Sequence, residues 1–158
     1  MIITRTPFRV SFAGGGSDLE AFYSHEPGCV LSSAINQYMY ITVKPCFGNA
    51  YRISYSETEN IQRRDQIQHP IVRECLSALG ISKGLEVVSM ADLPARTGVG
   101  SSSSFTVGLL NALHAYCGRL RSSSELADQA CRIEIDRLKE PIGKQDQLHR
   151  RVRRTAVY

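Results

Sequence analysis

Leu93-Pro94-Ala95-Arg96-Thr97-Gly98-Val99-Gly100-Ser101-Ser102-Ser103-Ser104 is the stretch of this sequence that carries the most structural information. A β-rich run at residues 85–90 precedes it, and residues 101–117 carry apolar side chains at helical spacing. The stretch is therefore predicted to join a strand to a helix. Because the first N–H groups of a helix lack intrahelical partners and the helix dipole is positive there, such a loop can bind an anion. Its glycines let a phosphate approach the backbone closely.

The four consecutive serines add hydroxyl donors and a candidate magnesium ligand. The loop lacks the Gly-Lys-Ser/Thr of a Walker A sequence, and the G-x-G-x-x-G spacing of a Rossmann fingerprint is absent. These absences argue against a P-loop hydrolase and a dinucleotide-binding fold. The alternative is that Gly98 and Gly100 only form a turn and that the serines only cap the helix.

Composition indicates one soluble globular domain of 158 residues, with 42% hydrophobic and 22% charged residues. No apolar run has the length of a membrane helix, and the first residues do not resemble a signal peptide, which favours the cytoplasm. The five cysteines form no C-x-x-C pair, so we expect mostly buried, reduced thiols and no structural metal.

The net charge of +4 comes entirely from four arginines within the last ten residues. Arg150, Arg151, Arg153 and Arg154 account for four of the 19 basic residues, and the other 15 balance the 15 acidic ones. A neutral body argues against a nucleic-acid partner, although a binder that uses the arginine tail is an alternative. We expect no membrane partner, and the oligomeric state is not predicted.

Periodicity predicts strands at residues 8–12, 29–31, 38–43, 51–55 and 85–90, and helices at 70–79, 101–117 and 123–138. Gly80 and Gly118 are placed to end two of the helices, and Ser122 with Glu125 forms a candidate capping box for the third. Strands first, followed by helices among strands, indicate an α+β fold.

The pattern Pro94-x-x-x-Gly98-Val99-Gly100-Ser101-Ser102-Ser103 resembles the signature loop of the GHMP kinases, which include galactokinase, homoserine kinase, mevalonate kinase and phosphomevalonate kinase. In that family the loop wraps the ATP phosphates. The resemblance implies an ATP site made of Pro94, Gly98, Val99, Gly100, Ser101, Ser102, Ser103 and Ser104. Ser102 matches the family's magnesium ligand, and Val99 replaces the usual Leu. The implied fold is the family's N-terminal domain, ribosomal protein S5 domain 2-like, over residues 1–147.

Two carboxylates further along the chain match the same family. Glu134, in the predicted helix 123–138, resembles a glutamate that helps to hold magnesium. Asp146, twelve residues later and followed by Gln147, resembles the catalytic base. Phosphoryl transfer to an alcohol needs both functions. Taken alone, Glu134 is read as a solvated helix residue and Asp146 as an ordinary loop carboxylate.

The N-terminal segment is similar to the opening of sugar kinases, in which a basic residue lies near the catalytic aspartate and another aspartate holds substrate hydroxyls. Arg9 is assigned the first role, where its guanidinium favours ionised Asp146 and steadies the transferring charge. The turn of Gly14, Gly15, Gly16, Ser17 and Asp18 is assigned to substrate binding. The alternative for Arg9 is a strand residue that faces solvent.

The subgroup resembled is the D-glycero-D-manno-heptose 7-phosphate kinases, through residues 6–19, 69–74 and 140–147. This implies ATP-dependent phosphorylation of a sugar or sugar phosphate, with heptose 7-phosphate at its anomeric hydroxyl the favoured acceptor, in nucleotide-heptose synthesis. The resemblance covers residues 2–147.

Residues 148–158 form a basic tail that departs from the family, and we hypothesise that it is a frameshift product. Family members are much longer, with a second, ferredoxin-like domain that closes over the site and has no counterpart in this chain. We therefore expect weak or absent activity from the chain alone. A catalytically silent nucleotide-binding module is the alternative.

Overall fold

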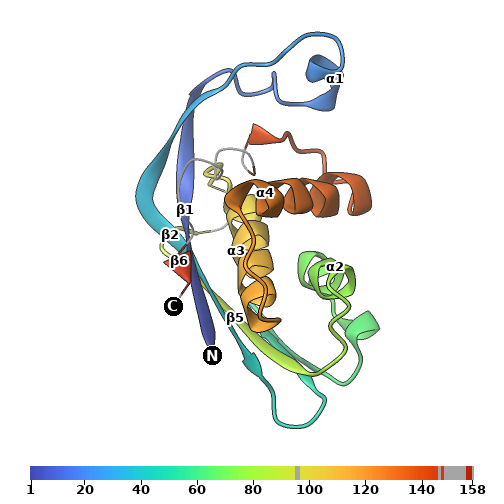
Figure 1. Ribbon diagram of the computed structural model, residues 1–158. Coiled ribbons are helices and arrows are strands. Elements are labelled where there is room, and N and C mark those ends of the chain that lie inside the picture. The colour runs from blue at the N-terminus through green and yellow to red at the C-terminus, as the bar shows by residue number, and fades with distance from the viewer. Residues whose placement is uncertain (95–96, 146, 148–155, 158) are drawn as a thin grey trace.

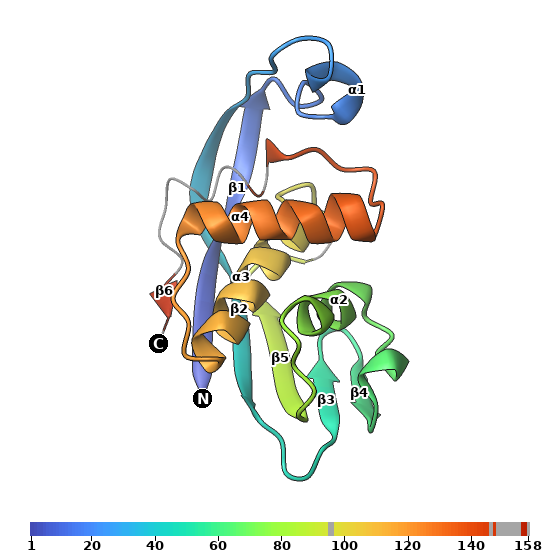
Figure 2. The same ribbon diagram turned by 45° about the vertical axis from the view of Figure 1, so that its right-hand side comes forward.

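The computed structural model describes residues 1–94, 97–145, 147 and 156–157. One mixed sheet of six strands, in the order β4-β3-β5-β2-β1-β6, carries the longer helices on a single face (Figures 1 and 2). The strands are β1 (Ile2–Ala13), β2 (Leu31–Pro45), β3 (Tyr51–Ser54), β4 (Thr58–Ile61), β5 (Leu85–Ala91) and β6 (Ala156–Val157). The helices are α1 (Glu20–Tyr23), α2 (Pro70–Ala78), α3 (Ser101–Tyr116) and α4 (Ser123–Cys131), with a 3-10 turn η1 (Arg64–Gln66) and a π-helix η2 (Arg132–Arg137). The α+β prediction is confirmed.

Helix α3 lies at the centre of the fold, between the sheet and helices α2 and α4 (Figure 2). Every side chain from Ser103 to His114 is buried, which is unusual for a helix of a small domain. Gly108 lets α3 approach β1 closely, because a Cβ there would lie 2.8 Å from Thr6 Oγ1. The Thr4 hydroxyl donates a 2.9 Å hydrogen bond to the Gly108 carbonyl. These contacts hold the middle of α3 against β1.

The predicted strand at residues 8–12 is the second half of a longer strand. β1 begins at Ile2, and its first half turns Thr4 and Thr6 toward the core, where both are fully buried. Because these core-facing residues are polar, the apolar alternation that marks a strand is hidden there. Likewise, the strands predicted at 29–31 and 38–43 are one strand, β2, which pairs along the length of β1.

Three further elements differ from the predictions. The single helix predicted at 123–138 is α4 followed by the π-helix η2. The short elements β4 and α1 were not predicted, because four residues carry too little periodicity to be recognised.

The Ser122–Glu125 capping box is confirmed: the Glu125 N–H donates to Ser122 Oγ at 3.2 Å, and the Ser122 N–H donates to Glu125 Oε2 at 2.8 Å.

The expectation for the cysteines was wrong in part. Cys75 is buried, but Cys29 and Cys117 are exposed, and Cys46 and Cys131 are half-buried. Cys117 lies in the turn that follows α3, and Cys29 lies in the irregular segment that precedes β2.

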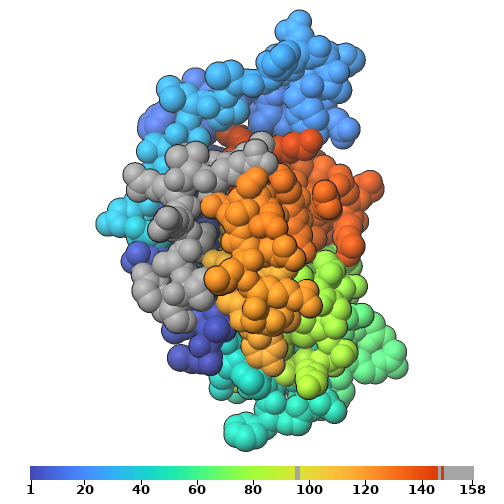
Figure 3. Space-filling model, viewed as in Figure 1, coloured from blue at the N-terminus to red at the C-terminus, as the bar shows by residue number. Residues whose placement is uncertain are grey.

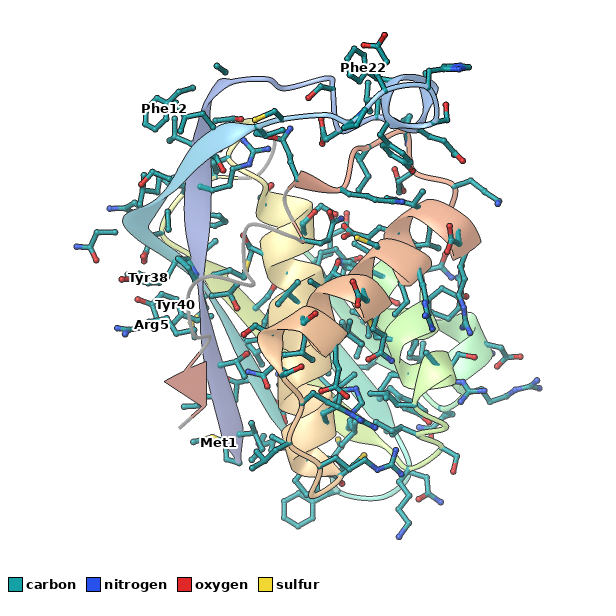
Figure 4. All side chains as sticks on the ribbon, turned by 45° about the horizontal axis from the view of Figure 1, so that its top comes forward. Met1, Arg5, Phe12, Phe22, Tyr38 and Tyr40 are labelled. Atoms are coloured by element: carbon teal, nitrogen blue, oxygen red, sulfur yellow. The ribbon has the colours of Figure 1, made fainter. Side chains whose placement is uncertain are left out.

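The sheet face opposite the helices carries aromatic side chains, among them Tyr38 and Tyr40, with Arg5 next to them (Figure 4). The Arg5 guanidinium carbon lies 4.6 Å from the centre of the Tyr38 ring, a cation–π contact. No helix in the described part of the chain is both long enough and apolar enough to cross a bilayer.

Candidate active site

The predicted phosphate loop leads directly into α3. Gly98 and Gly100 have φ angles of 74° and 72°, the left-handed region that disfavours residues with a Cβ. The first hydrogen bond of the helix runs from the Ser104 N–H to the Gly100 carbonyl at 2.9 Å. The N–H groups of Ser101, Ser102 and Ser103 therefore have no partner inside the helix. They offer donors to an anion where the helix dipole is positive.

The alternative that the serines only cap the helix is not supported. The N-cap residue of α3 is Gly100, and no side chain caps this helix among the described residues. The Ser104 hydroxyl donates back to the Gly100 carbonyl at 2.9 Å, and the Ser102 hydroxyl is directed to another element. Ser102 and Ser104 therefore form different contacts, and neither side chain caps the helix.

Ser102 and Glu134, the two predicted magnesium ligands, are in contact. The Ser102 hydroxyl donates a 2.6 Å hydrogen bond to Glu134 Oε1. The side-chain amide of Gln147 donates to the other carboxylate oxygen, Oε2, at 2.7 Å. Ser102 is exposed at the surface, whereas Glu134 and Gln147 are fully buried behind it. The reading of Glu134 as a solvated helix residue is therefore wrong.

The π-helix η2 carries Glu134. The Leu138 N–H bonds to the Ile133 carbonyl at 3.0 Å, a hydrogen bond that spans five residues instead of four. π-Helical turns are rare and are frequent at functional sites. The wider turn buries the polar Glu134 beside the apolar Ile133, a pair of neighbours that both face inward. Sequence periodicity assumes 3.6 residues per turn and so could not predict this placement.

Burial raises the pKa of Glu134 above its ordinary value of 4.5, and the hydrogen bonds from Ser102 and Gln147 act in the opposite direction. Among the described residues, no lysine or arginine forms an ion pair with this carboxylate. The carbonyl oxygen of the Gln147 side chain is also buried without a hydrogen-bond partner there. A buried carboxylate that lacks a compensating cation is costly in free energy, so this pocket suits a bound cation.

Arg9 connects β1 to the phosphate loop. Its backbone N–H donates to the Val99 carbonyl at 3.2 Å, and its Nη1 donates to the Gly98 carbonyl at 3.2 Å. The residue is only 8% exposed, so the alternative of a solvent-facing strand arginine is wrong. Arg9 brings a permanent positive charge to the loop and restrains its backbone at the same time.

The glycine-rich turn folds toward the segment that precedes Asp146. Asp18 Oδ1 accepts from the Gly16 N–H at 2.9 Å, and Asp18 Oδ2 accepts from the Gln145 N–H at 3.1 Å. The Gln145 side chain in turn accepts from the Ser11 hydroxyl at 2.9 Å. Asp18 therefore joins the turn to residues 143–145, a structural role that was not predicted beside its assigned role in substrate binding.

Two glycines make this arrangement possible. A Cβ on Gly143 would come within 1.8 Å of Asp18 Oδ2, and a Cβ on Gly14 would come within 1.9 Å of the Cys29 carbonyl oxygen. The Ser17 hydroxyl reinforces the turn by donating to the Gly14 carbonyl at 2.8 Å. Gly15 has no such close neighbour.

Ser17 and Asp18 of the turn and Gln145 line a cavity of about 350 Å³. Its walls also include Tyr23 and Lys144, which were not among the predicted site residues. In the space-filling view the blue N-terminal turn lies directly against the orange-red segment near residue 140 (Figure 3). In the sequence, the signal for Lys144 is its position two residues before the predicted base Asp146. Only the fold shows that Lys144 lines this cavity.

Asp146, the predicted base, and Ala95 and Arg96 of the loop lie outside the described residues, as do residues 148–155 of the predicted tail. Within that tail, Ala156–Val157 is strand β6, which pairs with Thr4 and Arg5 of β1. Both neighbours of Asp146 in sequence, Gln145 and Gln147, are anchored by the hydrogen bonds given above.

Comparison with known proteins identifies relatives of this arrangement. The chain is 30% identical to the D-glycero-alpha-D-manno-heptose 7-phosphate kinase of Campylobacter jejuni, over 92% of this chain and 47% of that protein. Over 41% of the chain it is 35% identical to a mevalonate kinase of Methanothermobacter thermautotrophicus. The chain thus spans about half the length, or less, of these curated relatives.

Among solved structures, a D-glycero-D-manno-heptose 1-phosphate kinase of Bacteroides thetaiotaomicron superposes with a TM-score of 0.82 at 24% identity, over 93% of this chain and 52% of that one. This likeness shows a shared fold. The model of the GHMP kinases N-terminal domain matches residues 67–149, which include the phosphate loop, α3 and the π-helix that carries Glu134. Because this match covers more than half of the chain, the protein belongs to the GHMP kinase family.

Proposed function

We propose that this chain forms the nucleotide- and acceptor-binding part of an ATP-dependent sugar kinase. The acceptor is a hydroxyl of a sugar or sugar phosphate, and the anomeric hydroxyl of D-glycero-D-manno-heptose 7-phosphate is the favoured candidate. The heptose 7-phosphate kinase relative supports this choice. The observation that carries the proposal is the 2.6 Å contact between Ser102, at the start of α3, and the buried Glu134.

The ATP phosphates are placed at the N–H groups of Ser101, Ser102 and Ser103. Gly98 and Gly100 keep the loop open, since both adopt positive φ and a Cβ on Gly98 would meet nothing within 4 Å. Helix α3 is buried from Ser103 to His114, which fixes the axis of the helix, so these donors are preorganised and little reorganisation is needed when charge develops during transfer.

Ser102 and Glu134 would hold Mg²⁺. Their hydroxyl and carboxylate oxygens are the hard donors that Mg²⁺ prefers, and the buried carboxylate has no described cationic partner. The ion would neutralise phosphate charge during transfer. Gln147 holds the second carboxylate oxygen in place and so fixes the orientation of Glu134.

Asp146 is assigned as the base that takes the proton of the acceptor hydroxyl. The acceptor oxygen forms a bond to the γ-phosphorus, the bond from that phosphorus to the β–γ bridging oxygen breaks, and ADP leaves. Arg9 places positive charge beside the loop, where it stabilises the transferring phosphoryl group.

Isothermal titration of the full chain with MgATP tests the nucleotide site. We expect binding to wild type and a loss of at least tenfold in Glu134→Gln, while ATP without the metal binds both proteins alike. Thermal unfolding of both proteins checks that the variant is folded. Equal MgATP affinities for the two proteins would contradict the assignment.

The second candidate function is a nucleotide-binding module without turnover, because the open N–H groups at the start of α3 and the Ser102–Glu134 contact would serve nucleotide binding alone equally well. A coupled assay of ADP release with heptose 7-phosphate separates the two. Turnover that depends on the acceptor supports the kinase, whereas MgATP binding without turnover supports the module.

A further inference from the structure

One cavity near the proposed site has a chemical character of its own. Its volume is about 350 Å³, within the range of small-molecule sites. Three segments enclose it: the glycine-rich turn with α1, the stretch that leads into β2, and residues 144–145. The lining residues are Ser17, Asp18, Tyr23, Gly28, Val30, Ser32, Lys144 and Gln145.

The two charged side chains of the cavity are in unlike situations. Both oxygens of Asp18 already accept backbone hydrogen bonds, from Gly16 and Gln145, at 2.9 and 3.1 Å. Lys144 forms no ion pair with any described carboxylate. The cavity therefore presents one ammonium group whose charge is not balanced by a direct partner.

Tyr23 holds this ammonium group in position. Lys144 Nζ lies 4.2 Å from the centre of the Tyr23 ring, a cation–π contact. A hydrogen bond with the Tyr23 side chain raises the pKa of Lys144, which keeps the group charged at neutral pH. An ammonium group has three donors on one compact centre, which suits a phosphate oxygen approached from the cavity.

The cavity also lies close to the proposed reaction centre. Gln145 lines the cavity, and Gln147 donates to Glu134. The Cα atoms of Gln145 and Gln147 are two residues apart and so lie at most about 7 Å from one another, which places the cavity and the Ser102–Glu134 pair beside neighbouring parts of the same segment. A molecule with a phosphate at one end and a hydroxyl at the other could reach both places.

We propose that Lys144, supported by Tyr23, binds the phosphate group of a phosphorylated acceptor, and that Ser17, Ser32 and Gln145 bind its hydroxyls. The inference rests on the proposed kinase function and adds the side chain that recognises the phosphate group of the favoured acceptor. Lys144 is then the residue that discriminates between the phosphorylated and the free sugar.

Calorimetric titration of the full chain tests this with three probes: D-glycero-D-manno-heptose 7-phosphate, the same heptose without phosphate, and inorganic phosphate. Wild type is expected to bind the phosphorylated sugar at least tenfold more tightly than the free sugar. Lys144→Met should lower the affinity for the phosphorylated sugar by about 10- to 100-fold, which is the range expected for the loss of a charged hydrogen bond. Its affinity for the free sugar and for MgATP should stay within twofold of wild type.

The matched control is Lys83→Met, which removes an exposed lysine on the loop between α2 and β5. It should change none of the affinities, and Lys144→Arg should restore part of the preference for phosphate. Equal losses for both sugars, no loss in Lys144→Met, or no binding of either sugar while MgATP still binds would each overturn the inference. Failure of the kinase proposal can be told apart from failure of the Lys144 proposal, because only the former predicts that the wild-type protein does not bind MgATP. Tight binding of inorganic phosphate to Lys144→Met would also overturn the role of Lys144.

Discussion

The hydroxyl of Ser102, in the first turn of α3, donates a 2.6 Å hydrogen bond to the fully buried carboxylate of Glu134 in the π-helix η2. This contact joins the phosphate loop to a segment more than thirty residues away and couples the proposed nucleotide site to the packing of the helices.

Replacement of Ser102 by Ala should lower both the stability of the protein and its affinity for MgATP. The substitution leaves Glu134 buried with one hydrogen bond fewer, which costs about 1.5–3 kcal/mol of unfolding free energy. MgATP affinity should fall, because a proposed metal ligand is lost. Urea unfolding and calorimetry measure the two effects. A variant with wild-type values in both would show that this hydroxyl does neither task.

Stability should depend on pH through Glu134. Burial raises the pKa of this carboxyl in the folded state above 4.5, so the folded protein binds the proton more readily than the unfolded chain. The stabilising contribution is fully present below pH 4.5 and is lost as pH rises through the raised pKa. Urea unfolding at successive pH values should show this loss in wild type, on top of the titration of other groups. In Glu134→Gln the corresponding component should be missing, and parallel curves for the two proteins would refute the assignment.

Gly143→Ala should disrupt the junction between the glycine-rich turn and residues 143–145. The added Cβ would lie 1.8 Å from Asp18 Oδ2, so the two segments must move apart, at a cost of about 1–3 kcal/mol. We expect weaker binding of the sugar phosphate with MgATP affinity kept. Gly15→Ala is the control for stability, since the nearest neighbour of its Cβ would be 3.8 Å away. Equal unfolding free energies for the two alanine variants in urea would argue against this role of Gly143.

Arg9→Met should weaken MgATP binding by about tenfold, because it removes both a positive charge beside the phosphates and the bond from Nη1 to the Gly98 carbonyl. Arg9→Lys keeps the positive charge but lacks the planar guanidinium, so its MgATP affinity should lie between those of wild type and Arg9→Met. Titration with MgATP at low and high salt checks the electrostatic part. An unchanged affinity in Arg9→Met would mean that Arg9 only supports the strand.

Ser122→Ala should destabilise the protein by about 1 kcal/mol through loss of the cap of α4. MgATP affinity should stay at the wild-type value, because Ser122 lies at the opposite end of α4 from the π-helix. This variant shows whether a stability loss of this size disturbs the site by itself. A parallel loss of MgATP affinity would indicate that α4 as a whole positions Glu134.

The strand, loop and helix around residues 85–117 were predictable because they depend on local rules. Apolar spacing marks β5 and α3, and the glycines at 98 and 100 mark backbone that needs positive φ. The capping box of Ser122 and Glu125 is equally local. In contrast, the first half of β1 was missed because two threonines, Thr4 and Thr6, take the place of apolar residues in the core.

By itself, the sequence determined the α+β class and the strand–loop–helix of the candidate phosphate loop, since both depend on residue type and short spacing. Its resemblance to the GHMP kinases supplied the candidate carboxylates Glu134 and Asp146. Only the tertiary structure decided that Glu134 is buried against Ser102, that Arg9 restrains the loop, and that Lys144 and Tyr23 line one cavity. The physical reason is that these contacts join segments more than thirty residues apart. Their geometry follows from packing around α3 and from the wide turn of η2, neither of which leaves a periodic signal in the sequence.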